Sequence, residues 1–145
     1  MSTPTTVEWL ENILRVAKTL PEEVHLSLWQ ECGTPRCLWG HCCVDPFFEN
    51  LGFKLFGAED WGYQGKISAT PGKHLNIPEK DIDWMFMPYC YEEAMMSLKG
   101  VEDFYDLNKN WDDEIPKYLV IQHVEEILTK YQEKATWTDQ QQLNG

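Results

Sequence analysis

The chain has 145 residues, of which 24 are acidic and 12 are basic, so its formal net charge at neutral pH is −12. A negative charge of this size repels phosphate backbones and argues against direct binding to nucleic acid. Apolar residues make up 43% of the chain and aromatic residues 13%, which predicts a folded domain with a hydrophobic core.

No apolar run reaches the ~18 residues that a membrane-spanning helix needs. The first residues also lack the basic patch and apolar core of a signal peptide. We therefore expect a cytoplasmic protein with no membrane contact, whose cysteines stay reduced. The five cysteines are an odd number, which argues against a framework built from disulfides alone.

The two ends of the chain carry the clearest helical patterns. Thr5 and Glu8 form a capping-box pattern before an apolar face, which predicts a helix over residues 6–19. Pro116 opens a second amphipathic pattern, whose apolar stripe predicts a helix that ends at about Tyr131. We therefore expect a single globular domain over residues 1–135 and a frayed polar tail over residues 136–145.

Shorter elements are predicted between these helices. Asp45 and Pro46 give an N-cap followed by proline at the first helical position, and Gly52 is a natural stop. The remaining segments predict a hairpin from strands 53–56 and 65–69, a loop over 70–78, and short helices over 92–98 and 101–107.

The stretch from residue 29 to residue 53 holds four of the five cysteines. Cys32 and Gly33 begin a turn in which Thr34 is a suitable N-cap and Pro35 suits the first helical position. This pattern predicts a helix over residues 35–44. Gly40 in its middle costs roughly 1 kcal/mol relative to alanine, which suggests that another backbone packs close to it.

The string Trp29-x-x-Cys32-Gly33-Thr34-x-x-Cys37-x-x-Gly40-His41 resembles a motif in small uncharacterised proteins of bacteria and their phages. The resemblance covers about two thirds of the chain and includes the later Leu55-Phe56-Gly57 segment. It implies a fold and a biological context but no activity. We interpret the shared residues Cys32, Gly33, Thr34, Cys37 and Gly40 as a structural motif.

Two chemical alternatives use the same stretch. Cys37 and His41 are four residues apart on one predicted helix face, and Cys32 and Cys42 flank them, so the four could hold zinc tetrahedrally. The chain nevertheless lacks the Cys-x-x-Cys pairs of zinc fingers and ribbons, so we favour small buried cysteines that pack a tight helix and expect no bound zinc. Alternatively, Cys37 could act as a thiol nucleophile, with His41 or His123 as its base.

A further group of aromatic residues falls mostly in predicted loops. With an acidic surround, exposed aromatic side chains are typical of a protein-binding face. The candidate binding residues are Trp61, Tyr63, Trp84, Phe86 and Trp111. The alternative is that loop aromatics fold over a small helical core.

The sequence predicts a mainly α, compact single domain of five or six short helices with at most one small β-hairpin. The functional hypothesis is a non-enzymatic protein-binding module of bacterial or phage origin. It would engage a host or viral protein whose own surface is basic, and it would need no cofactor. The rivals are a small metal-binding or thiol-dependent enzyme that uses Cys32–Cys43, and an acidic mimic that blocks a nucleic-acid-binding protein.

Overall fold

The computed structural model describes residues 4–25, 30–31, 34–35, 38–56, 60–63, 66–67, 75–103, 107 and 114–144. Within these ranges the chain has six α-helices, four of them with seven or more residues. The prediction of a mainly α fold is therefore confirmed, although the strands form three short antiparallel sheets instead of one hairpin. In the same ranges, no helix combines the length and the apolar character needed to cross a lipid bilayer.

Helix α1 (Thr6–Lys18) agrees with the prediction for residues 6–19. The predicted capping box is present, because the Thr5 hydroxyl accepts from the Glu8 N–H and the Glu8 carboxylate accepts from the Thr5 N–H. These bonds satisfy N–H groups that have no partner inside the helix. The buried face of α1 consists of Trp9, Leu10, Ile13, Val16 and Ala17.

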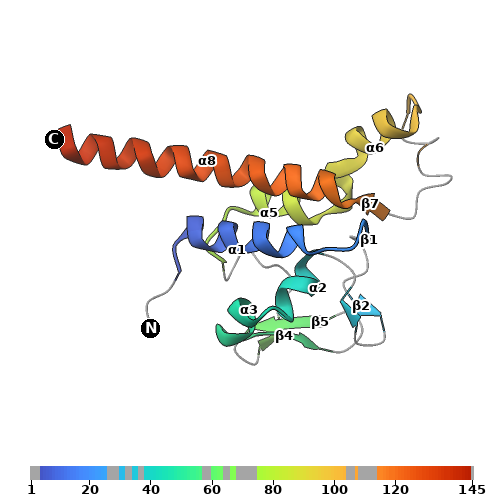
Figure 1. Cartoon of the computed structure of the whole chain (residues 1–145), viewed down its shortest axis with the longest axis horizontal. Helices are drawn as coiled ribbons and strands as arrows, with labels where there is room; N and C mark the ends of the chain where they lie inside the picture. Colours follow the sequence, from blue (N-terminus) through green and yellow to red (C-terminus); the bar gives the residue numbers. More distant parts are fainter. Residues whose placement is uncertain are drawn as a thin grey trace.

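Helix α8 (Lys117–Asn144) runs antiparallel to α1 and lies alongside it (Figure 1). The predicted stripe is confirmed: Val120, Val124, Ile127 and Leu128 are buried, and Tyr131 is partly buried against them. The prediction that the helix ends near Tyr131 is wrong. No proline or glycine occurs between residues 117 and 144, so nothing in the backbone stops the helix before Asn144.

Helices α2 (Leu38–Cys43) and α3 (Pro46–Asn50) lie on the other side of α1 (Figure 1). The start of α3 was predicted correctly, since the Asp45 side chain accepts from the Phe47 N–H and Pro46 occupies the first position. Gly40 of α2 is buried, as predicted.

The predicted start of α2 is wrong. Thr34 and Pro35 form the short strand β3 (Thr34–Pro35), which pairs with β2 (Gln30–Glu31), so Thr34 is not a helix N-cap. A residue before proline is pushed toward extended backbone, and proline is tolerated in edge strands, which explains the strand. The helix begins only at Leu38.

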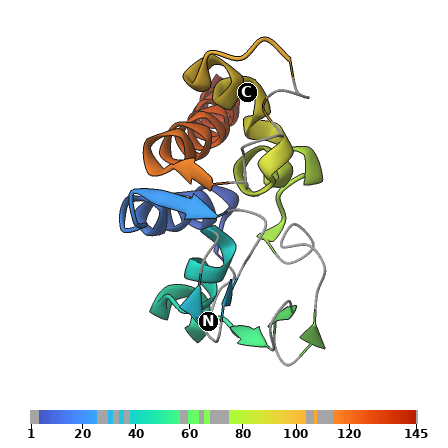
Figure 2. The ribbon, with the colours of Figure 1, turned by 90° about the vertical axis from the view of Figure 1, so that its right-hand side faces the viewer.

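An aromatic cluster fills the space between α1, α2 and α5 (Glu79–Phe86). The Trp39 ring contacts Phe53 at 5.1 Å and Phe86 at 5.6 Å between ring centroids, both edge to face. Trp9 stacks on Phe48 at 5.7 Å. Edge-to-face and offset aromatic pairs stabilise a core beyond their buried area. The cluster thus joins α1 and α5 to the segments of α2, α3 and β4, which lie below α1 in Figure 2.

Two short sheets connect the helices. Strand β1 (Glu23–His25) pairs with β7 (Glu114–Pro116), and the opposed Val24 and Ile115 side chains are both fully buried. Strand β4 (Phe53–Phe56), which was predicted, pairs with β5 (Asp60–Tyr63), and β5 pairs with β6 (Lys66–Ile67). The predicted pairing of residues 53–56 with 65–69 is therefore wrong.

The segment after α5 turns through a 3-10 helix, η1 (Pro88–Tyr91), into α6 (Glu92–Lys99). The predicted helix 92–98 is confirmed, and Gly100 ends it in the left-handed conformation at φ +69°. Residues 104–106 of the predicted helix 101–107 lie outside the described residues, as do residues 70–74 of the predicted loop.

Candidate functional site

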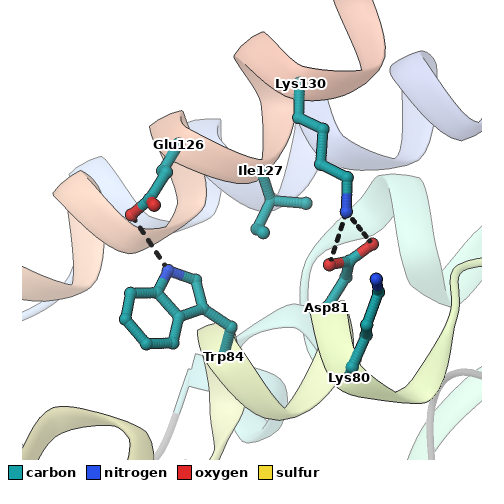
Figure 3. A pocket seen from close by; sticks show the side chains of 6 residues that line it. All are labelled: Lys80, Asp81, Trp84, Glu126, Ile127 and Lys130. Carbon is teal, nitrogen blue, oxygen red and sulfur yellow. Dashed lines mark hydrogen bonds and ion pairs between the residues drawn. The ribbon is translucent and has the colours of Figure 1, made fainter. Parts of the chain in front are cut away.

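A surface pocket of about 380 Å³ opens between α5 and α8 (Figure 3). The described residues that line it include positively charged, negatively charged and aromatic side chains. Lys80, Asp81 and Trp84 come from α5, and Glu126, Ile127 and Lys130 come from α8. The spacing within each helix, three or four residues, places these side chains on the facing sides of the two helices.

The position of Trp84 follows from the way α5 ends. In an α-helix the carbonyl of residue i accepts from the N–H of residue i+4, and residue 88 is a proline without an N–H. The Trp84 carbonyl accepts instead from Nδ1 of His123 on α8, at 2.8 Å. The next carbonyl, that of Met85, accepts from the Tyr91 hydroxyl at 2.8 Å. Side chains from α8 and η1 thus cap the C-terminus of α5.

The same two side chains hold the Trp84 ring. His123 stacks on Trp84 with 4.1 Å between ring centroids and on Tyr91 with 3.9 Å, and both pairs are nearly parallel. Tyr91 is fully buried, His123 is 7% exposed, and Trp84 is half-buried. The indole is therefore fixed against the protein while part of it lines the pocket.

The protonation state of His123 follows from its partners. A carbonyl oxygen only accepts, so Nδ1 must carry a proton. Burial lowers the pKa of His123 below its ordinary value, and it outweighs the hydrogen bond to the Trp84 carbonyl and the charge of Glu126, which both act in the opposite direction. His123 is therefore neutral at pH 7, with its hydrogen on Nδ1.

One end of the pocket is closed by an ion pair. Both carboxylate oxygens of Asp81 accept from Lys130 Nζ, at 3.0 and 3.1 Å, and Oδ2 also accepts from the Tyr131 hydroxyl at 2.7 Å. Burial alone would raise the pKa of Asp81, but the bond from Tyr131 and the bonds and charge of Lys130 together lower it. Asp81 thus stays ionised and is neutralised by Lys130.

The other end is formed by Glu126. Its Oε2 accepts from the Trp84 indole N–H at 3.1 Å (Figure 3). Glu126 also lines a second, neighbouring hollow of about 320 Å³ on the outer face of α8, together with Gln122, Glu125 and Thr129. The charged residues of this second hollow are both carboxylates.

These groups favour non-covalent recognition. The site offers an aromatic surface, an apolar floor at Ile127 and carboxylates, while Asp81 and His123 already have hydrogen-bond partners. In the ranges that the structure describes, no group of three or more histidine, cysteine or acidic side chains is arranged to hold a metal ion.

The predicted binding residues are only partly brought together. Trp84 lines the pocket, although it lies on a helix and not in a loop as predicted. Phe86 is 6% exposed and contacts Trp39, so it is a core residue, and its assignment to the surface is wrong. Trp61 and Tyr63 belong to β5, but their side chains lie outside the described part of the chain, as does the whole of Trp111.

The cysteine stretch is described in part. Cys42 and Cys43 are buried in the core, which fits the interpretation of small buried cysteines. His41 lies on α2 and is half-buried. Cys32, Gly33 and Cys37 lie outside the described residues, so neither the zinc hypothesis nor the Cys37–His41 hypothesis is tested.

Of the described residues that line the pocket, sequence reasoning identified Trp84 as a binding residue and missed five: Lys80, Asp81, Glu126, Ile127 and Lys130. One signal was available, because His123, Glu126 and Lys130 follow a helical stripe beside the core stripe that contains Ile127 and Tyr131. Such a stripe predicts a partner helix but does not say which helix it is.

Comparison of the chain with protein-family models, curated proteins and solved structures finds no match. The resemblance carried by the Trp29–His41 motif therefore rests on the sequence pattern alone.

Proposed function

We propose that this chain is a non-enzymatic protein-binding module of bacterial or phage origin that engages a basic surface of a host protein. One observation carries the proposal: in a chain of net charge −12, a half-buried tryptophan lies in an open pocket beside two exposed carboxylates, Glu125 and Glu126. Aromatic anchors contribute much of the affinity of protein interfaces, and complementary charge speeds association.

Additional exposed side chains support an interaction surface close to Trp84. Tyr89 of η1 is 56% exposed, and its hydroxyl donates to Asp83 of α5 at 2.7 Å. This hydrogen bond, together with the charge of Asp83, raises the pKa of Tyr89 to about 12, so the hydroxyl remains protonated. Tyrosine on a surface offers a rigid apolar ring with a polar tip, which suits a protein interface.

The two rival functions lack this support. Of the cysteines that the enzymatic alternative uses, Cys42 and Cys43 are buried and offer no accessible thiolate, while Cys32 and Cys37 lie outside the described residues. On α8, Lys117, Lys130 and Lys134 interrupt the acidic residues, so the described part of this helix does not present the continuous negative charge expected of a nucleic-acid mimic.

The test is affinity capture of partners from a bacterial lysate, followed by titration of each purified candidate with this protein at low and high salt. We expect a saturable complex with a basic protein, and its affinity should fall as salt rises, because exposed charges are screened over ~8 Å at physiological salt. The proposal is contradicted if a purified candidate binds with the same affinity at all salt concentrations. It is also contradicted if none of the captured candidates binds once it is purified.

A matched pair of variants locates the interface. Glu125→Gln/Glu126→Gln removes two carboxylates beside Trp84, and Glu22→Gln/Glu23→Gln removes two exposed carboxylates next to β1. Both variants change the net charge equally. Only the first should weaken the complex strongly, and equal weakening by both would mean that net charge acts without a defined surface.

A further inference from the structure

The two hollows on α8 are adjacent, because Glu126 lines both. The first hollow has the Trp84 ring and the apolar Ile127 side chain between its two ends. The second hollow adds Glu125 on the outer face of the helix. A ligand that follows α8 from one hollow to the other therefore passes a tryptophan and then two carboxylates.

The two ends of this path differ in charge: lysines lie at the inner end and carboxylates at the outer end. At the inner end, the charge of Lys130 is neutralised by Asp81 through two hydrogen bonds, so among the described residues that line this hollow Lys80 is the remaining cation. At the outer end, Glu126 is held by a neutral indole N–H and keeps its full charge, and Glu125 lies beside it. The site is negative where it opens onto the outer face of α8.

We propose that this site receives an arginine-containing segment of the partner, with one guanidinium placed against Trp84 and paired with Glu126, and a second basic side chain over Glu125. This inference rests on the proposed binding function and specifies the chemistry of the partner. It assigns the methylene groups of the arginine to the apolar surface of Ile127.

Arginine fits this site better than lysine. Its planar guanidinium can stack on an aromatic ring and bond to a carboxylate at the same time, whereas an ammonium group is a compact, strongly hydrated charge. The Glu126 carboxylate has one oxygen bonded to the indole N–H, which places the carboxylate at the edge of the ring. The long side chain of arginine also covers apolar surface while its charge remains near water.

The probe is the tetrapeptide acetyl-Gly-Arg-Arg-Gly-amide, and the readout is the indole N–H resonance of Trp84, which is identified by its loss in Trp84→Phe. This N–H donates to Glu126, so a guanidinium that binds the carboxylate must change its resonance. We expect a saturable shift with the arginine peptide and a weaker one with the lysine peptide. The uncharged citrulline peptide should give none.

Three variants that remain folded by circular dichroism give the contrast. Glu126→Gln should weaken peptide binding by about fivefold, in line with the loss of an exposed ion pair. Glu133→Gln makes the same charge change on the same helix outside both hollows and should leave binding unchanged. Lys80→Gln removes a cation from the inner end of the first hollow, so the arginine peptide should bind more tightly.

The arginine site is overturned if Glu126→Gln and Glu133→Gln weaken peptide binding equally, or if the citrulline peptide binds as tightly as the arginine peptide. It is also overturned if acetate or phosphate binds and Lys80→Gln abolishes that binding. The arginine site is likewise overturned if the protein self-associates and the Trp84 indole N–H resonance shifts or disappears on self-association, since a second copy would then occupy the site. If a basic partner binds with salt dependence but the peptide does not, only this inference fails. If no partner binds, the proposed function itself fails.

Discussion

Replacement of His123 tests the idea that α8 caps the end of α5. In His123→Ala the Trp84 carbonyl loses its only described donor, and Pro88 cannot replace it because it has no N–H. An unsatisfied buried polar group costs ~1–3 kcal/mol. Loss of the two stacked ring contacts adds about 0.5–1.5 kcal/mol each. These contributions sum to about 2–6 kcal/mol, and because the His123–Trp84 bond is only part-buried we expect the lower half of that range, a fall in the free energy of unfolding of about 3 kcal/mol.

His123→Phe separates the two contributions. A phenyl ring can keep both stacking contacts but cannot donate to the Trp84 carbonyl, so we expect a loss of about 1–2 kcal/mol. Gln122→Ala changes an exposed neighbour on the same helix and should alter stability by less than ~0.5 kcal/mol. Urea unfolding followed by circular dichroism measures all three, with the m-value as a check on two-state behaviour.

The capping argument is wrong if His123→Phe is as stable as the natural protein, because the hydrogen bond to Trp84 would then contribute nothing. It is also wrong if the phenylalanine and alanine variants are equally destabilised, since the stacking of His123 between Trp84 and Tyr91 would have no measurable value. A stability loss in Gln122→Ala as large as in His123→Ala would show that the loss is not specific to His123, since alanine has the higher helix propensity and should not weaken the helix at either position.

Three more predictions concern stability. The pKa of His123 in the folded protein is lowered from its ordinary value of 6.5, so the unfolded chain binds more protons just below that pH. The free energy of unfolding should therefore drop as pH falls below about 6.5. His123→Phe should remove this pH dependence in urea titrations. Asp45→Ala removes the cap of α3 and the paired bonds to Arg15 at 2.7 and 2.8 Å, which should cost about 1.5 kcal/mol in the same assay, whereas Glu49→Ala should not. Gly100→Ala should cost about 1 kcal/mol although nothing lies within 4 Å of an added Cβ, because φ is +69°; a neutral result in thermal unfolding would show that α6 ends differently.

The helix ends were predictable where local chemistry decides them. Thr5 with Glu8, Asp45 with Pro46, and Gly100 all act within a few residues of themselves, and the structure has each helix boundary that they predict. Thr34 and Pro35 offered the same kind of signal, yet they form a strand, because an N-cap residue and proline are also compatible with extended backbone. Local rules therefore failed where a pairing strand competed with the helix.

The site could not be predicted from local chemistry, because it depends on contacts between distant residues. Trp84 and Glu126 are 42 residues apart, and Asp81 and Tyr131 are 50 apart. The sequence shows that α5 and α8 each have a mixed aromatic and charged stripe, but it does not show that the two stripes face each other. Phe86 was misplaced for the same reason, since its contact with Trp39 of α2 appears only in the folded chain.

The structure also determines which residues can test binding without changing stability. Trp84 lines the pocket, but its carbonyl and its ring are both held by His123, so a change at Trp84 alters the end of α5 and the surface together. Glu126 is exposed and donates nothing to the core, and its described bond is to the edge of the indole. Because the charge of Glu126 can be removed while its size is kept, Glu126→Gln reports on recognition, whereas weakened binding in Trp84→Ala could arise equally from a loosened helix.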